Sequence, residues 1–396
     1  MRTIFAYVVV SLLVLTIVEG AVRAYEMSQA ATSTEGVEGL LQSLPETKIF
    51  GREIGNQFLA HNVALFKRLP DPEAVHSAFV GSSRSKVLRP ARFGLADAVN
   101  GSGNSYNEIS YGLLLQAEII RLQLPNLRKV YVETPVLMRR HDGLTMERDH
   151  QKYFPLLLSL MPLIDQLDQA KQTKAEIVDY GMSGGSPDSH LLHFVRYRSE
   201  LRLTNLYRRL IGADGSIPVY DDPWFKTVRP NGERIDLSAA MNANPLPPIA
   251  REHPKIQRLT DIRGNFPWDG LFDLFAIWGK AHNIQIVFYQ PPVRSDVLEF
   301  EKEYGLDLHV EDLKRVSEKY HIPFIDLERD GLGFAEDWSL FSDEDHMETC
   351  TGSTLLLEAI LQGETMFEQD GQLFPAISRR AVESASSQEL ASCNGK

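Results

Sequence analysis

Five short apolar runs, nearly free of charge, recur along the chain, and helical patterns lie between several of them. The runs are AFVGS (78–82), RFGLADAVN (92–100), KVYVET (129–134), IQIVFYQ (284–290) and PFIDL (323–327). Short continuous apolar runs are typical of strands buried on both faces, as in parallel sheets. Helical patterns cover 106–123, 268–283 and 310–321. This alternation predicts an α/β fold with a parallel sheet and right-handed crossovers.

The third and fourth runs are far apart in the sequence. The intervening stretch contains helical patterns at 152–172 and 190–210 and a proline-rich segment at 221–254. We interpret residues from about 140 to 265 as a helical insertion that is able to cover the site, within one domain spanning 47–366. The tail, 367–396, is rich in Ser, Ala and Glu and is predicted to be flexible.

The N-terminal segment is apolar from Ile4 to Val18 and follows Arg2. Its length is near the lower limit for crossing a bilayer, so residues 1–26 are interpreted as a signal anchor and 27–46 as a polar stalk. A cleaved signal peptide and a buried core helix are the alternatives, although the arginine in Val22-Arg23-Ala24 makes a poor cleavage site. The anchor would place the rest of the chain outside the cytoplasm.

The charge balance and the cysteines narrow the classes of partner and compartment. The chain has 41 basic and 53 acidic residues, a net charge of −12 that would repel a phosphate backbone, so a nucleic-acid partner is not expected. Cys350 and Cys393 are its two cysteines. Outside the cytoplasm they could form one disulfide, and two free thiols are the alternative.

Polar residues follow the first apolar run at GSSRS, 81–85. In an open parallel sheet, ligands bind where strands end and helices begin. A serine here would gain from the N–H groups and dipole of the helix expected to follow, which favour negative charge on a reacting oxygen. The alternative is that a serine only caps that helix.

A serine hydroxyl needs a base to become a nucleophile, and His346 is the best placed of the histidines. Asp343 precedes His346 by three residues, so a single turn can aim the carboxylate at one ring nitrogen and leave the other free. The alternative is an acidic helix N-terminus with an incidental histidine. Asp345 is a possible substitute for Asp343. No metal site or cofactor is predicted.

Three segments together resemble the SGNH (GDSL-like) hydrolase superfamily. They are Gly81-Ser82-Ser83-Arg84, Asn100-Gly101-Ser102 and Asp343-Glu344-Asp345-His346. The resemblance implies a three-layer sandwich with a flavodoxin-like parallel sheet, in which the serine of G-x-S attacks an acyl group. Aligning G-x-S and D-x-x-H with this chain selects Ser83 as nucleophile, His346 as base and Asp343 as its orienting acid.

The layout is also similar to the D-alanyl-lipoteichoic acid biosynthesis protein D family and to SGNH-type polysaccharide O-acetyltransferases. That similarity implies acyl transfer from a polytopic membrane-bound O-acyltransferase to a polysaccharide or glycan, on the outer side of the inner (cytoplasmic) membrane. An envelope serine esterase or deacetylase, and a non-catalytic adaptor of such a membrane complex, are the alternatives. In the alginate enzymes the acid and histidine can precede the serine, whereas here they come last.

The sequence departs from the family pattern at the third block, where an asparagine usually completes the oxyanion hole. Here Glu133 or Thr134 occupies about that position. We therefore expect the hole to consist of the backbone N–H groups of Ser83 and Gly101, with Asn104 as a side-chain donor. Arg84 is expected either to orient an anionic sugar or lipid headgroup or to form a surface ion pair.

Overall fold

The computed structural model describes residues 47–48, 66, 69–103, 111–139, 160–175, 225–228, 231–237, 247–260, 262 and 270–385. The chain divides into two units, Met1–Pro45 and Glu46–Lys396. The predicted anchor and stalk lie outside the described residues. Among the residues that are described, no helix has the length and apolar character needed to cross a bilayer.

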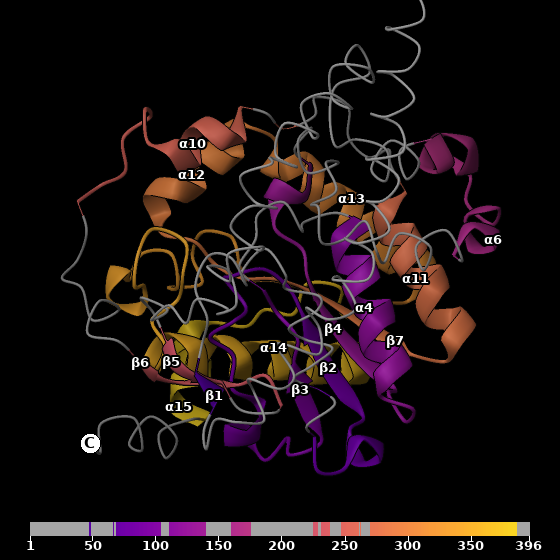
Figure 1. Ribbon diagram of the computed structural model, residues 1–396. Helices are drawn as coiled ribbons and strands as arrows, with labels where there is room; N and C mark the ends of the chain where they lie inside the picture. Colours follow the sequence, from indigo (N-terminus) through magenta and orange to yellow (C-terminus); the bar gives the residue numbers. More distant parts are fainter. Residues whose placement is uncertain are drawn as a thin grey trace, which may run out of the picture. The chain divides into compact units, whose positions relative to one another are not determined.

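A five-stranded parallel sheet forms the centre of the second unit (Figure 1). Its strands are β2 (Ser77–Val80), β3 (Ala98–Asn100), β4 (Lys129–Glu133), β7 (Gln285–Gln290) and β8 (Phe324–Asp326). They lie in the order β3-β2-β4-β7-β8, and every neighbouring pair is parallel. Counted along the chain this is the doubly wound order 2-1-3-4-5, whose direction reverses between β2 and β4. The predicted α/β fold with a parallel sheet is confirmed.

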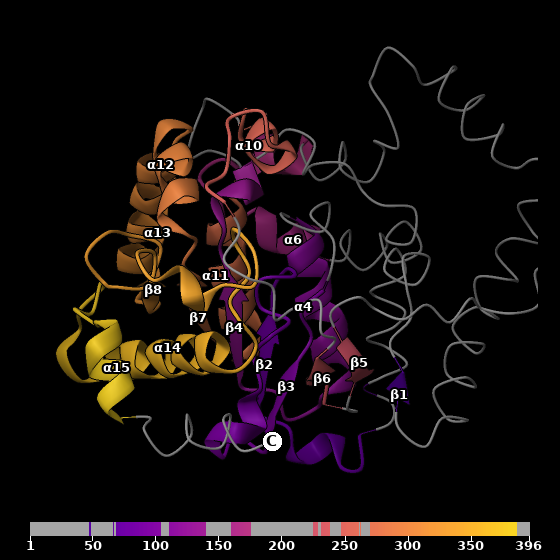
Figure 2. The same ribbon diagram turned by 90° about the vertical axis from the view of Figure 1, so that its left-hand side faces the viewer.

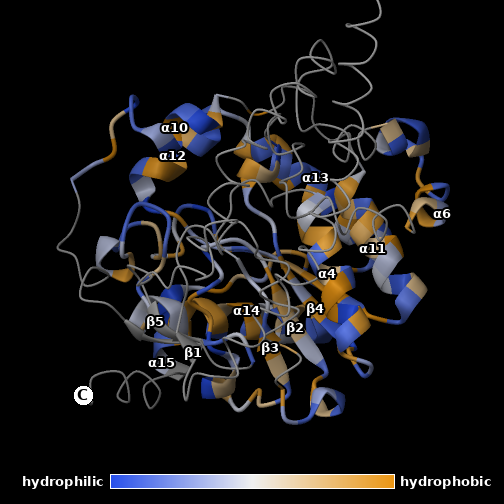
Figure 3. Ribbon diagram, in the orientation of Figure 1, coloured by the Kyte–Doolittle hydropathy of each residue, from blue (hydrophilic) through white to orange (hydrophobic). Residues whose placement is uncertain are grey.

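Two separate apolar clusters cover the two faces of this sheet. Val80, Val132 and Phe288 pack in one cluster with residues of α4 (Tyr111–Gln123), α11 (Leu271–His282) and α13 (Leu306–Tyr320). Phe79 and Tyr131 point to the other face, where they pack with α14 (Thr351–Asp370). Figure 2 shows the sheet between these helices, and Figure 3 shows apolar residues recurring along α4, α11 and the strands. Alternation along fully buried strands produces this arrangement.

The other described helices are short or lie at the margins of the sheet. They are α6 (Met161–Ile164), α10 (Pro254–Leu259), α12 (Ser295–Glu303) and α15 (Arg379–Ala385), with 3₁₀ turns η1 (Pro72–Ala74), η2 (Pro90–Phe93), η4 (Val136–Arg139) and η9 (Trp338–Leu340). In the 92–100 run only the last three residues form a strand, because Pro90 starts a 3₁₀ turn that ends at Gly94, whose φ is +73°.

The segment after β2 differs from the prediction. Residues 81–88 form successive turns and no regular helix, with the Ser85 N–H donating to the Ser82 carbonyl and the Lys86 N–H to the Ser83 carbonyl. The Glu133 carboxylate accepts hydrogen bonds from Ser82 and Ser85. The Asn100 side chain donates to the carbonyls of Ser85, Lys86 and Leu88, so side chains of neighbouring strands stabilise these turns. The expected support from a helix dipole at Ser83 is therefore absent from the described structure.

The structure describes the first part of the segment 367–396, which is predicted to be a flexible tail. α14 continues to Asp370, and α15 follows with the Val382 and Ile377 side chains buried against the same apolar cluster as α14. Ile377 and Val382 therefore pack against α14 while some other residues between 371 and 384 are exposed, and 386–396 lie outside the described residues. Cys350, at the start of α14, is disulfide-bonded, and the chain's other cysteine, Cys393, also lies outside them.

The described parts of the insertion include a structure that the sequence patterns did not predict. β5 (Phe225–Val228) pairs antiparallel with β6 (Arg234–Leu237) and with β1 (Thr47–Lys48) in a small second sheet. The helical pattern at 190–210 lies outside the described residues. Between β5 and β6, the Asn231 carbonyl accepts a hydrogen bond from the Asn100 N–H at 2.8 Å, which ties the insertion to the edge strand β3.

Candidate active site

Ser83, His346 and Asp343 meet beyond the carboxyl ends of the central strands. Ser83 Oγ lies 2.7 Å from His346 Nε2 although 263 positions separate the two residues. On the other side of the ring, Nδ1 lies 2.8 Å from Asp343 Oδ2 and 2.9 Å from Oδ1. The structure thus brings the three residues selected from the sequence into one hydrogen-bonded chain. Ser83 and His346 are both buried.

The local sequence explains how the acid is aimed at the histidine. Asp343 Oδ1 accepts hydrogen bonds from the backbone N–H groups of Asp345, at 3.0 Å, and His346, at 2.9 Å. A bridge between Phe341 and Met347 closes this turn, which begins just after η9 and ends just before α14. An aspartate that accepts bonds from its own turn is a common way to shape one. The D-x-x-H spacing therefore sets both the backbone and the side-chain geometry.

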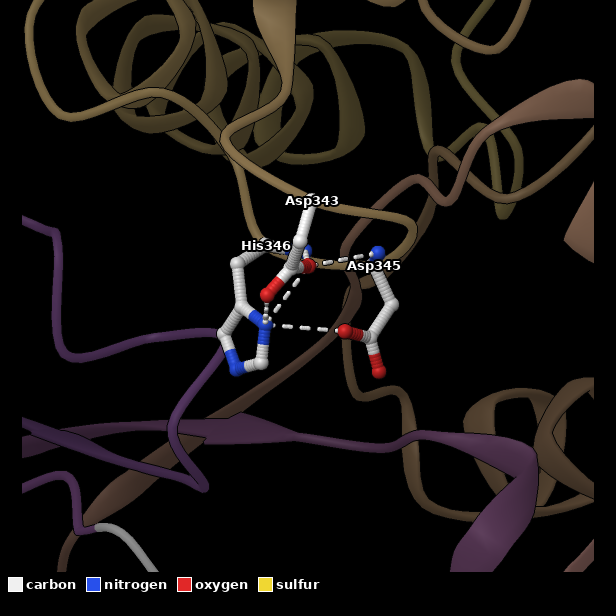
Figure 4. A group of neighbouring side chains, drawn as sticks. All are labelled: Asp343, Asp345 and His346. Carbon is white, nitrogen blue, oxygen red and sulfur yellow. Dashed lines mark hydrogen bonds and ion pairs between the residues drawn. The ribbon is translucent and has the colours of Figure 1, made fainter. Parts of the chain in front are cut away.

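His346 has a second carboxylate on the same nitrogen. Asp345 Oδ1 lies 2.8 Å from Nδ1. In Figure 4 the carboxylates of Asp343 and Asp345 approach this nitrogen together, while the other ring nitrogen points away from both. Burial alone would lower the pKa of His346, but the two carboxylates outweigh it and raise this pKa to about 9. The carboxylates keep a proton on Nδ1, and Nε2 becomes free to act as a base as the pH rises toward this pKa.

The turn that carries Ser83, residues 81–88 (the nucleophile turn), is stabilised by Glu133, the last residue of β4. Its carboxylate accepts hydrogen bonds from the Ser82 N–H at 2.8 Å, from the Ser82 hydroxyl at 2.6 Å and from the Ser85 hydroxyl. The Tyr289 hydroxyl donates to Ser85 Oγ at 2.6 Å. Glu133 is fully buried. Glu133, one of the two residues that the sequence places at about the position of the family's oxyanion asparagine, is thus an acceptor that braces the turn carrying Ser83.

The oxyanion donors expected from the sequence are only partly supported. The Ser83 N–H donates to no acceptor among the described residues, so it is free to bind a developing oxyanion. The expectation for Gly101 is corrected, because its N–H donates to the Phe79 carbonyl at 2.9 Å as an extension of the sheet. The N–H of Gly103 is likewise taken by the Gly81 carbonyl. Asn104 lies outside the described residues.

Both expectations for Arg84 are also corrected. Its side chain is buried rather than presented at the surface. Nη2 donates to the Pro291 carbonyl at 2.7 Å and lies 3.5 Å from Glu328 Oε1, and Glu328 is itself buried. The guanidinium is therefore buried and contacts residues that follow the ends of β7 and β8.

Lys255 of α10 joins the site from the insertion, which no sequence pattern indicated. Its ammonium pairs with Asp345, with Glu344 at 2.9 Å and with Asp343 at 3.5 Å. The donor atoms of Asp343, Asp345 and His346 lie within 4.8 Å of one another, a spacing that can suit a metal ion. Because an ammonium already neutralises these carboxylates, we assign the cluster as an ion-pair network.

The arrangement suits nucleophilic catalysis in its chemistry. A hydroxyl, an imidazole and a carboxylate lie in hydrogen-bonding sequence, and the Ser83 N–H has no acceptor in the part of the chain that the structure describes. Comparisons of the chain with models of protein families, with curated proteins and with solved structures find no match.

Proposed function

We propose that this chain is an SGNH-like serine O-acyltransferase that acts outside the cytoplasm, in the cell envelope. The observation that carries the proposal is the 2.7 Å contact of Ser83 Oγ with His346 Nε2, with Asp343 on the opposite nitrogen. The doubly wound strand order and the position of Ser83 at the reversal between β2 and β4 also support an SGNH-like fold.

In the proposed first half-reaction, His346 takes the Ser83 proton while Ser83 Oγ forms a bond to the acyl carbon of the donor. The oxyanion is bound by the Ser83 N–H. When the tetrahedral intermediate collapses, the bond to the leaving group breaks and His346 returns the proton to that group. Asp343 keeps the ring in the tautomer with a proton on Nδ1 throughout.

In the second half-reaction, an acceptor hydroxyl loses its proton to His346 and attacks the acyl-serine, and the proton returns to Ser83 as the ester bond to it breaks. The acceptor is a hydroxyl of a polysaccharide or other envelope glycan. A polytopic membrane-bound O-acyltransferase supplies the acyl group. These assignments rest on the layout shared with the anchored O-acetyltransferases. A site with only one described oxyanion donor also favours a bound acceptor over water, because an acceptor held in place gains effective concentration.

Labelling with a fluorophosphonate tests the proposal. Such a probe bonds covalently to a serine that has an active base, so the native chain is expected to be labelled and Ser83→Ala is not. Thr365→Ala is the matched control. This hydroxyl is exposed on α14, outside the turn of residues 343–346 that carries the acid and the base (the acid turn), and it donates only to the Leu361 carbonyl. It should label as the native chain does.

The same proteins distinguish the acyltransferase from the two alternatives, an esterase and a non-catalytic adaptor. If neither the native chain nor the control is labelled, the catalytic proposal fails and an adaptor role remains. If the native chain is labelled and hydrolyses small acetyl esters as fast with water as with any added glycan or polyol, it is an esterase. Transfer is supported when an added hydroxyl acceptor gains the acyl group in preference to water.

A further inference from the structure

Lys255 contacts the acid turn from α10, a short helix of the insertion that is held in place by contacts outside the triad. α10 begins at Pro254, a favourable first helical residue, and its Ile256 and Leu259 side chains are buried. The segment before it is tied to α12, because the Ile249 N–H donates to Asp296 at 2.7 Å and Arg294 donates to the Pro247 carbonyl at 3.1 Å. Contacts outside the triad therefore fix the backbone that carries Lys255.

Without Lys255, the described groups around Nδ1 of His346 would carry an excess of negative charge. On Nδ1 the ring faces two carboxylates, Asp343 and Asp345, where a triad needs one. On Nε2 it faces Ser83. Among the described residues, Lys255 from α10 pairs with these carboxylates, and Arg84 from the nucleophile turn interacts electrostatically with Asp345. Glu344 pairs with Lys255 at 2.9 Å and lies 3.7 Å from the half-exposed His253.

We propose that Lys255 is a positioning residue of the reaction proposed above, and that it offsets the second carboxylate, Asp345, so that His346 becomes an active base at a lower pH than it would beside two unopposed carboxylates. The inference rests on the proposed function. Its physical reason is that two anions on one imidazole stabilise the protonated ring, and a protonated ring cannot accept the Ser83 proton. An ammonium bound to both carboxylates opposes that stabilisation.

The sign of each substitution follows from this balance. In Lys255→Met both carboxylates lose the ammonium that opposes their effect on His346, so the pKa of His346 rises and the reaction requires a higher pH. In Asp345→Asn one anion is removed, so the pKa falls and the reaction proceeds at lower pH. The double variant loses one charge of each sign and should return close to the native behaviour. A nearby charge shifts a pKa by about one unit or more.

The first experiment does not depend on activity. In the Ser83→Ala background, the ring of His346 is titrated by NMR in protein with labelled histidine, and Lys255→Met is expected to raise its midpoint by about one pH unit. Lys255→Arg, which keeps the cation, is expected to stay near the native midpoint. The rest of the spectrum reports whether each variant is folded. An unchanged midpoint in folded Lys255→Met overturns the inference.

The second experiment uses the intact nucleophile. The rate of fluorophosphonate labelling is followed against pH, and the rising limb is expected to move up by about one unit in Lys255→Met, down in Asp345→Asn and back in the double variant. A uniform loss at every pH, with the limb unmoved, means that Lys255 is only structural and overturns the inference. Absence of labelling in the native chain instead overturns the proposed function, and the NMR titration then still decides the role of Lys255.

Discussion

Replacing Glu133 with glutamine tests whether this buried carboxylate braces the nucleophile turn. Glu133 lies at the end of β4 with no exposed surface and accepts from the Ser82 N–H, the Ser82 hydroxyl and the Ser85 hydroxyl. Glutamine has nearly the same shape, but it has one acceptor oxygen and an NH₂ group in place of the other. In Glu133→Gln the NH₂ group takes one acceptor place and the charge is lost, so at least one of the three hydrogen bonds to this carboxylate is lost or reversed.

The cost can be worked out from these contacts. A hydrogen bond to a charged group contributes about 1.5–3 kcal/mol, and a buried donor left unsatisfied costs about 1–3 kcal/mol. Losing one or two of the three bonds predicts a fall of about 2–4 kcal/mol in the free energy of unfolding, with slower labelling of Ser83 because its turn is less well held. That is a large share of a typical domain's stability of about 5–15 kcal/mol.

Urea unfolding followed by tryptophan fluorescence measures this change. The matched control is Glu299→Gln, because Glu299 is exposed and pairs only with Lys302 on the surface of α12, where a change within about 0.5 kcal/mol is expected. If Glu133→Gln is as stable as this control, the bracing role is refuted. Loss of labelling with native stability would place Glu133 in the reaction itself, for example near the oxyanion.

Three further predictions concern the base, the buried arginine and the acid turn. Because the pKa of His346 is about 9 and the base must be unprotonated, the labelling rate should rise about tenfold per pH unit from pH 6 to 8 and level off above 9; a plateau already at pH 7 would contradict this. Arg84→Met leaves buried Glu328 without its cation and should lower the free energy of unfolding by about 3–5 kcal/mol in urea, with recovery on adding Glu328→Gln; no recovery would mean that the ion pair is not the cause. Gly352→Ala puts a Cβ 2.3 Å from the Leu340 carbonyl oxygen, so it should destabilise by about 1–3 kcal/mol and slow labelling, whereas a stabilised variant would show that this contact is relaxed.

Much of the sheet and of the triad could be predicted from local patterns. The apolar runs at 78–82, 129–134 and 284–290 correspond to β2, β4 and β7, because strands buried on both faces have to be apolar throughout. The D-x-x-H spacing carries its own geometry, since Asp343 shapes the turn that presents His346. The serine was predicted because parallel strands end at the same edge of a sheet, where loops from distant parts of the chain meet.

Only the tertiary structure decided what surrounds these residues. Whether the Gly101 N–H is free depends on the register of β3 against β2, and its bond to the Phe79 carbonyl takes that donor away. The direction of Arg84 depends on the turn at Ser83, and the role of Glu133 depends on β2 and β4 being neighbours. Lys255 reaches the acid turn across 90 positions. The sequence by itself therefore determined which residues can do the chemistry, because strand burial and turn spacing are local properties. Their hydrogen-bond partners and charge balance were decided only by packing, because these depend on contacts between segments distant in the chain.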